Sequence, residues 1–228
     1  MKNRKRQIAS AILVLSFVCM MSLSAIAGIS DSVKIESWGN AVQKYVDNPM
    51  GENDTVKQSL APADNVIILP QIEIDQAKDF YISAGYSDAD AQEAAIAYVK
   101  EINTLYQEAI KHGYAVTDDE ISAHIEQMKV DFQTAENKDE IYDFINSFEN
   151  EEAYWDFQFE MLKKDLPIQR YVADKENEYI NRNTPNNLSA GANSVEYSDK
   201  VLEIQEEWVE QFEVIKDDAE NRYEYKIE

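Results

Sequence analysis

The stretch LYQEAIKHGYAVTDDEISAHI, Leu105 to Ile125, contains the end of one helix and the start of the next within a few residues. Gly113 follows an apolar-periodic run and is the residue type that readily adopts the left-handed conformation beyond a helix C-terminus. Thr117 precedes Glu120 by three positions, which is the spacing of a capping box at a helix N-terminus. The stretch therefore predicts a tight corner between two helices, and it carries no catalytic motif.

Helical periodicity continues on both sides of this corner, because apolar residues recur at steps of three and four along one face. Before the helices, Val66–Leu69 is a short apolar run that ends at Pro70, and it predicts a small strand or a buried extended segment. The expected helices are 75–83, a long helix opened by Ser87 with Asp90 and ending at 112, 118–135, a short helix opened by Asn137, a helix capped by Asn150 with a kink or break near Asp165–Leu166 just before Pro167, and a final helix with the stripe Val201, Ile204, Trp208, Phe212 and Ile215.

These patterns predict an all-α protein: a single helical domain of about five to six helices, with a C-terminal helix that packs back on the others. Asn, Ser, Pro and Gly dominate the segment between the last two long helices, which predicts a linker there. The expected division is 1–27 signal peptide, 28–65 irregular N-terminal extension, 66–182 helical domain, 183–197 linker, 198–217 C-terminal helix and 218–228 frayed tail.

The first residues have the form of an export signal. A basic start is followed by the apolar run Ile8–Met21 and by the small residues Ala25 and Ala27, so we expect cleavage before Gly28 and an extracytoplasmic mature protein. The alternative is an uncleaved anchor, which would be the one contact with a membrane. Cys19, the only cysteine, lies inside this segment, so the cleaved protein would have no thiol and no disulfide.

The charge balance limits the partners. The chain has 21 basic and 44 acidic residues, a formal net charge of −23. Such a chain is a poor ligand for nucleic acid or for an anionic membrane surface. No nucleophile–base pair, metal-ligand set or phosphate-binding loop stands out, so we expect neither an enzyme nor a cofactor, metal or small-molecule substrate.

One segment has an excess of aromatic residues. FENEEAYWDFQF, Phe148 to Phe159, has five in twelve positions. They form either the core of a small bundle or an exposed apolar surface for other chains. We assign Trp155 and Phe159 to the core. The candidates for a peptide-binding face are the residues that flank this stripe: Tyr154, Phe157 and Met161.

Two segments resemble the N-terminal chaperone domain of SurA-like and PrsA-like extracytoplasmic foldases. In that family a long helix ends in E-A-x-x-x-G, and V-[ST]-x-x-E opens the next helix. The corresponding residues here are Glu108, Ala109, Gly113, Val116, Thr117 and Glu120. The second segment, YDFINSFENEEAYWDFQFEMLKKDLPIQRYV, is similar to the following helix pair, in which a phenylalanine-rich turn leads into an E-E-x-[YW]-W-like start. The resemblance extends from about Val66 to Ile180.

The chain departs from the family at two points. The family opens with a strand and an Asn-Gly turn, whereas this chain has Leu69-Pro70-Gln71. Family members also commonly insert a parvulin isomerase domain before the last helix, where this chain has only the linker. The resemblance therefore implies a chaperone-like holdase that binds unfolded or exported polypeptides without prolyl isomerase activity. The alternative is a structural or adaptor subunit of a cell-envelope complex that docks one protein partner. The sequence does not indicate an oligomeric state.

Overall fold

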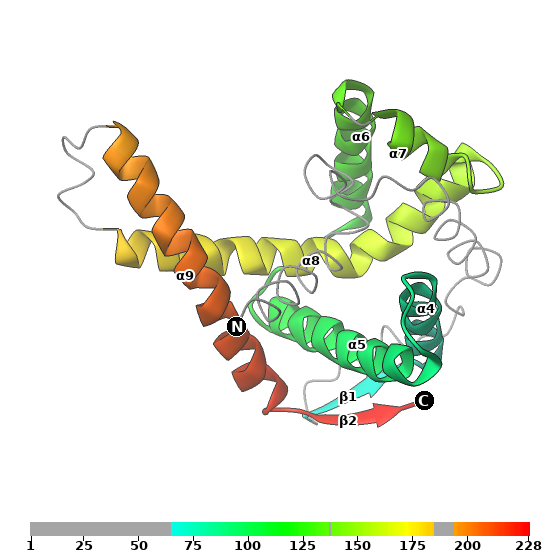
Figure 1. The fold of residues 1–228 in the computed structure, drawn as a ribbon, viewed down its shortest axis with the longest axis horizontal. Helices are drawn as coiled ribbons and strands as arrows, with labels where there is room; N and C mark the ends of the chain where they lie inside the picture. Colours follow the sequence, from blue (N-terminus) through cyan, green and yellow to red (C-terminus); the bar gives the residue numbers. More distant parts are fainter. Residues whose placement is uncertain (1–64, 137, 185–193) are drawn as a thin grey trace.

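The computed structural model describes residues 65–136, 138–184 and 194–228 (Figure 1). Helices account for most of these residues, as the all-α prediction requires, and the one sheet has two short strands. The predicted signal residues Ala25, Ala27 and Gly28, and nearly all of the 28–65 extension, lie outside the described residues. The elements in chain order are β1 (Val66–Leu69), α4 (Gln71–Ser83), α5 (Asp88–Lys111), α6 (Asp118–Thr134), α7 (Lys138–Ile145), α8 (Glu151–Asn183), α9 (Ser194–Glu220) and β2 (Glu224–Ile227).

The corner between α5 and α6 has the predicted structure. Gly113 has a φ of 88°, a left-handed conformation that an L-residue with a Cβ adopts only with strain. At the start of α6 the Glu120 backbone N–H donates to Thr117 Oγ1 at 3.3 Å, and the Thr117 N–H donates to Glu120 Oε2 at 2.9 Å. The capping box is therefore complete and fixes where α6 begins.

Two further predicted caps are present. The Ser87 side chain accepts from the Asp90 N–H at the start of α5, and the Asn150 side chain accepts from the Ala153 N–H at the start of α8. Asn137, predicted to cap the short helix, lies outside the described residues. The sequence could predict these caps because the donor and the acceptor of each are only three residues apart in the chain.

The prediction for the first helix was four residues short. α4 begins at Gln71 rather than at Asp75, because the carbonyl oxygen of Pro70 already accepts from the Glu73 and Ile74 N–H groups at 3.1 and 3.3 Å. Proline is favoured at a helix start, where a missing N–H costs nothing. The preceding segment forms the strand β1, one of the two forms that the sequence allowed.

Three clusters of buried side chains hold the elements together. The first joins α6, α7 and the N-terminal half of α8, and Ile141 and Leu162 are fully buried in it. The second joins α5, the middle of α8 and α9, through residues such as Ile168 and Trp208. The third lies between β1, α4 and α5 around Ile74. Because α8 contributes to two clusters, it connects the α6–α7 end of the molecule to the rest (Figure 1).

α8 continues through Pro167 without a break. It spans 33 residues, and Pro167 is buried inside it. The helix changes direction part-way along its length (Figure 1). Of the two predicted possibilities, a kink or a break, the structure therefore has the kink.

The prediction of a frayed C-terminal tail is wrong. α9 extends from Ser194 to Glu220, beyond both expected ends at 198 and 217. Residues Glu224–Ile227 then form β2, which pairs in parallel with β1 so that Leu69 lies opposite Ile227. The Gln71 N–H also donates to the Glu228 carbonyl oxygen at 2.7 Å. Local pattern could not show this strand, because its partner lies at the other end of the described chain.

Side chains of α5 hold the segment after α9 in place. Glu108 is only 4% exposed, and its carboxylate accepts hydrogen bonds from Arg222 Nη2 at 2.8 Å and from Tyr223 Oη at 2.6 Å. One turn earlier, the hydroxyl groups of Thr104 and Tyr225 are hydrogen-bonded at 2.8 Å. A buried carboxylate needs such partners, so these contacts determine where the C-terminal segment lies.

The same side of α5 also contacts α9 itself. Lys216 is 5% exposed and forms ion pairs with Glu101 of α5 at 3.0 Å and with Glu213 at 2.9 Å. Lys100 pairs with Glu220 at 2.6 Å. We call the α5 residues in these two sets of contacts the α5 polar row: Lys100, Glu101, Thr104 and Glu108.

Replacing Glu108 with Gln should lower the free energy of unfolding by about 1.5–3 kcal/mol, the range for hydrogen bonds to a charged group. The matched control is Glu207→Gln on α9, where the glutamate is exposed. Urea unfolding of the two variants and the wild type measures the effect. Equal stability of the two variants would show that the Glu108 contacts do not hold the C-terminal segment.

Candidate peptide-binding site

The three residues predicted to form a peptide-binding face do not form an open surface. Tyr154 is 1% exposed, and its ring contacts those of Phe144 and Phe148, with centroids 6.2 and 5.2 Å away. Phe157 is half-buried against Phe148, and Met161 is also half-buried. Tyr154 therefore belongs to the core, and its assignment to the flank was wrong.

The buried face of α8 is rotated relative to the predicted stripe. Trp155 and Phe159, assigned to the core, are half-buried at its margin, and Trp155 Nε1 donates to a Glu151 carboxylate at 3.0 Å. The positions that face inward include two polar residues, Gln158 and Asp165, at 1% and 6% exposure. A stripe drawn through apolar residues alone skips these two positions, and this explains the error.

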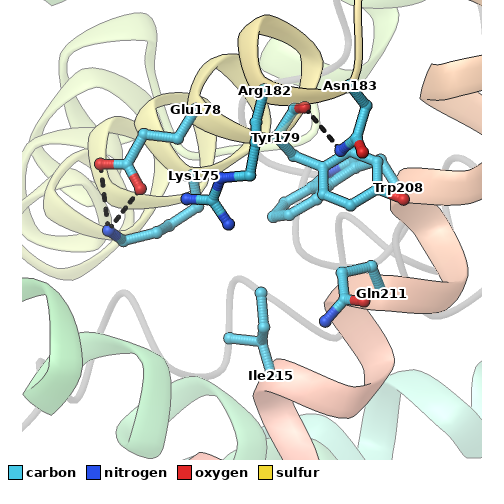
Figure 2. Close-up of a pocket in the computed structure, with 8 residues that line it drawn as sticks. All are labelled: Lys175, Glu178, Tyr179, Arg182, Asn183, Trp208, Gln211 and Ile215. Atoms are coloured by element: carbon cyan, nitrogen blue, oxygen red, sulfur yellow. Dashed lines mark hydrogen bonds and ion pairs between the residues drawn. The ribbon is translucent and has the colours of Figure 1, made fainter.

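A pocket of about 340 Å³ lies between the C-terminal half of α8 and α9 (Figure 2). The α8 side contributes residues at helical steps of three and four, which brings them to one face over two turns. Trp208, Gln211 and Ile215 face them from α9. The α8 residues that line the pocket are Lys175, Glu178, Tyr179, Arg182 and Asn183.

The inner wall of the pocket is aromatic. The rings of Tyr179 and Trp208 lie 5.7 Å apart, and Trp208 contacts Phe212 at 5.3 Å within the second buried cluster. The Asn183 amide donates to the Tyr179 carbonyl oxygen at 2.9 Å, which orients the last turn of α8 beside the pocket. The wall is therefore continuous with the core, and on the α9 side Trp208 is only 6% exposed.

The rim of the pocket is polar and charged. Lys175 Nζ pairs with the Glu178 carboxylate at 3.0 Å and lies 5.8 Å from the centre of the Tyr171 ring. Arg182 extends its guanidinium toward the space between the two helices, and no described residue forms an ion pair with it (Figure 2). The Gln211 side chain faces this space from α9.

These features suit binding. An aromatic and aliphatic wall can hold one or two apolar side chains, and the amide and guanidinium groups can satisfy polar groups of the same ligand. The volume is near the lower limit of ligand pockets, so a few residues of an extended chain fit it better than a large cofactor. Within the described part of the chain, no group of three or more His, Cys, Asp or Glu side chains is arranged to hold a metal ion.

This site was not predicted from the sequence. Trp208 and Ile215 were expected in a core stripe, and they are buried and half-buried respectively. Their proximity to Lys175, Tyr179 and Arg182 on α8 was not expected. One signal for this site is present in the sequence: Lys175 and Arg182 lie on either side of Tyr179 at helical spacing. What the sequence could not show is that α9 crosses this face.

A second polar cluster lies where α4, α5 and α8 meet. Lys164 Nζ donates to the Glu73 carboxylate and, at 3.2 Å, to Asn103 Oδ1, while the Asn103 amide donates to Glu73 Oε2 at 2.9 Å. Asp165 lies next to this cluster without a hydrogen-bond partner among the described residues. Burial raises the pKa of its carboxyl group to about 7; the Lys164 ammonium opposes this increase, and the Glu73 carboxylate adds to it.

A carboxyl group with so strongly raised a pKa can mark a functional site. Here the group is 6% exposed at a junction of three helices, so a ligand has little access to it. We therefore assign Asp165 to the fold, and the α8–α9 pocket remains the candidate site.

No described helix is both long enough and apolar enough to cross a bilayer. Comparison with known proteins adds no relative: no protein-family model, curated protein or solved structure matches the chain. The resemblance to the SurA-like and PrsA-like domain thus remains a prediction from the sequence.

The raised pKa of Asp165 predicts how stability depends on pH. Between about pH 4 and pH 7 the folded carboxyl binds more protons than the unfolded one, so this group's contribution to stability falls as pH rises through that window. The amide side chain of the Asp165→Asn variant cannot ionise, so the variant should lack this decline in stability and be more stable than the wild type at pH 8. The difference in free energy of unfolding between the two proteins should grow by up to about 1.4 kcal/mol per pH unit within the window.

Thermal and urea unfolding of both proteins from pH 4 to pH 8 measures this difference. Asp143→Asn is the control, because Asp143 is exposed on α7. A stability difference between Asp165→Asn and wild type that does not change with pH would show that Asp165 is ionised in the folded state throughout.

Proposed function

We propose that this protein is an extracytoplasmic, chaperone-like holdase that binds segments of unfolded or exported polypeptides in the α8–α9 pocket, without prolyl isomerase activity. The observation that carries the proposal is the composition of the pocket: an aromatic wall formed by Tyr179 and Trp208, with amide and cationic side chains around it. The sequence resemblance and the export signal support the class of function and the compartment.

The pocket replaces the binding face that we expected from the sequence. The earlier candidate at Tyr154 is closed against α7 and the turn that follows it, so a client cannot reach that ring. Residues of the α8–α9 pocket are reachable: Gln211 is exposed, while Tyr179 and Ile215 are half-buried. Apolar segments of a client would gain roughly 25 cal/mol for each Å² of apolar surface that they bury there.

One observation favours the second candidate, an adaptor that docks one partner. Among the described residues, the large exposed apolar side chains outside the pocket are scattered over several elements. A small pocket alone suits a short, defined motif of a single partner at least as well as many clients. The two candidates differ in the number of proteins that bind, and the experiment below separates them.

In this experiment an unfolded client aggregates with and without the mature protein, and light scattering follows the time course. The protein should slow aggregation of several unrelated clients and leave the rate of prolyl isomerisation unchanged. About 3- to 10-fold more of the Ile215→Ser variant should be needed for equal protection, because the pocket wall loses a half-buried aliphatic side chain.

The control is the adjacent residue on the same helix. Val214 is also β-branched but is 51% exposed and does not line the pocket, so Val214→Ser should protect as the wild type does. Gln211→Ala tests the pocket without removing a core contact, and circular dichroism confirms that each variant is folded. Absence of protection for every client, at several-fold excess, would reject the holdase proposal and favour the adaptor.

A further inference from the structure

Arg182 is unusual among the cationic side chains of this protein. Most of the other described lysine and arginine side chains that lie on a helix have a carboxylate within ion-pair distance, such as Lys164 with Glu73 and Arg170 with Glu120. The exceptions are Lys138 and Lys111, and Lys111 donates instead to Tyr223 Oη at 2.6 Å. With 44 acidic residues against 21 basic ones, an acidic partner is easily available on this surface. Arg182 nevertheless has no such partner in the described part of the chain and extends into the pocket (Figure 2).

The surroundings of Arg182 suit a carboxylate ligand. The nearby Lys175 and Glu178 side chains neutralise one another at 3.0 Å, so the lining has one cation in excess. A guanidinium can donate two parallel hydrogen bonds to a carboxylate, which a lysine cannot. The adjoining wall of Tyr179, Trp208 and Ile215 is apolar, so the pocket offers an anion site and an apolar site side by side.

The net charge of −23 opposes the approach of an acidic ligand, but it acts over a longer range. At physiological ionic strength the interaction between exposed charges is screened over about 8 Å. A carboxylate bound to the guanidinium would lie about 3 Å from it, well inside that distance. The local cation therefore outweighs the remote acidic residues, and the net charge mainly slows association.

We propose that the α8–α9 pocket selects polypeptide segments in which an acidic side chain lies beside an aromatic or aliphatic one, with Arg182 binding the carboxylate. This inference rests on the proposed function and names its preferred client sequence. The ligand is an internal acidic side chain rather than a chain terminus, because an unfolded client has one terminal carboxylate but many acidic residues.

Labelled peptides that differ at one position test the inference. One has Glu beside Phe and an amidated C-terminus, the second has Gln in place of that Glu, and the third is the Gln peptide with a free C-terminal carboxylate. Fluorescence polarisation at 0.15 M salt should show about tenfold tighter binding of the Glu peptide than of either Gln peptide, as expected for a charge-assisted bidentate contact.

Arg182→Gln should abolish this preference, and Arg182→Lys should retain only part of it. The matched control is Lys226→Gln, which removes the same charge from exposed β2, away from the pocket. If the preference depended only on net charge, both variants would lose it equally. If Arg182 binds the carboxylate, Lys226→Gln should leave the preference intact.

Equal binding of the Glu and Gln peptides to the wild type would overturn the inference. So would a preference that survives Arg182→Gln, preferential binding of the free terminus, or no binding of any peptide. Failure of the inference is distinguishable from failure of the holdase proposal. If the wild type protects clients and Ile215→Ser weakens that protection, the pocket binds clients without reading their charge.

Discussion

The contact between the buried Glu108 carboxylate and the segment after α9 is the constraint on which the arrangement of this protein depends. Glu108 lies on α5, whereas its partners Arg222 and Tyr223 lie more than a hundred residues later in the chain. Leaving such a carboxylate buried and unpaired is costly, so the folded state is tied to one position of the C-terminal segment. The other members of the α5 polar row repeat this constraint along the helix.

This constraint also shapes the candidate site. The pocket exists because α9 crosses the C-terminal half of α8, and two sets of contacts hold α9 in that position: the ion pair of Lys216 with Glu101, and the pairing of β2 with β1. Binding at a pocket whose walls are already in place loses less conformational entropy than binding to a mobile surface. The polar row thus links the end of the chain to the function that we propose.

The accuracy of the sequence predictions follows the range of the interactions involved. Caps such as Thr117 with Glu120 depend on residues three apart, and they were predicted correctly. The rotation of α8 was missed because Gln158 and Asp165 occupy inward positions that an apolar stripe does not reveal. The strand β2 and the pocket were missed because each depends on two segments that meet only in the folded chain. Tyr225, for example, is read locally as part of a polar tail.

Hydrogen exchange of the backbone amides after Glu220 tests the central claim most directly. If the α5 polar row holds the C-terminal segment, the β2 amides that are hydrogen-bonded to β1 should exchange at rates close to those in the middle of α5, and both should exchange through the same opening reaction. Exchange of the residue 224–228 amides at the rate of an unstructured peptide, while α5 stays protected, would contradict the account. In that case α9 would be free to move away from α8, and the pocket would not be a preformed site.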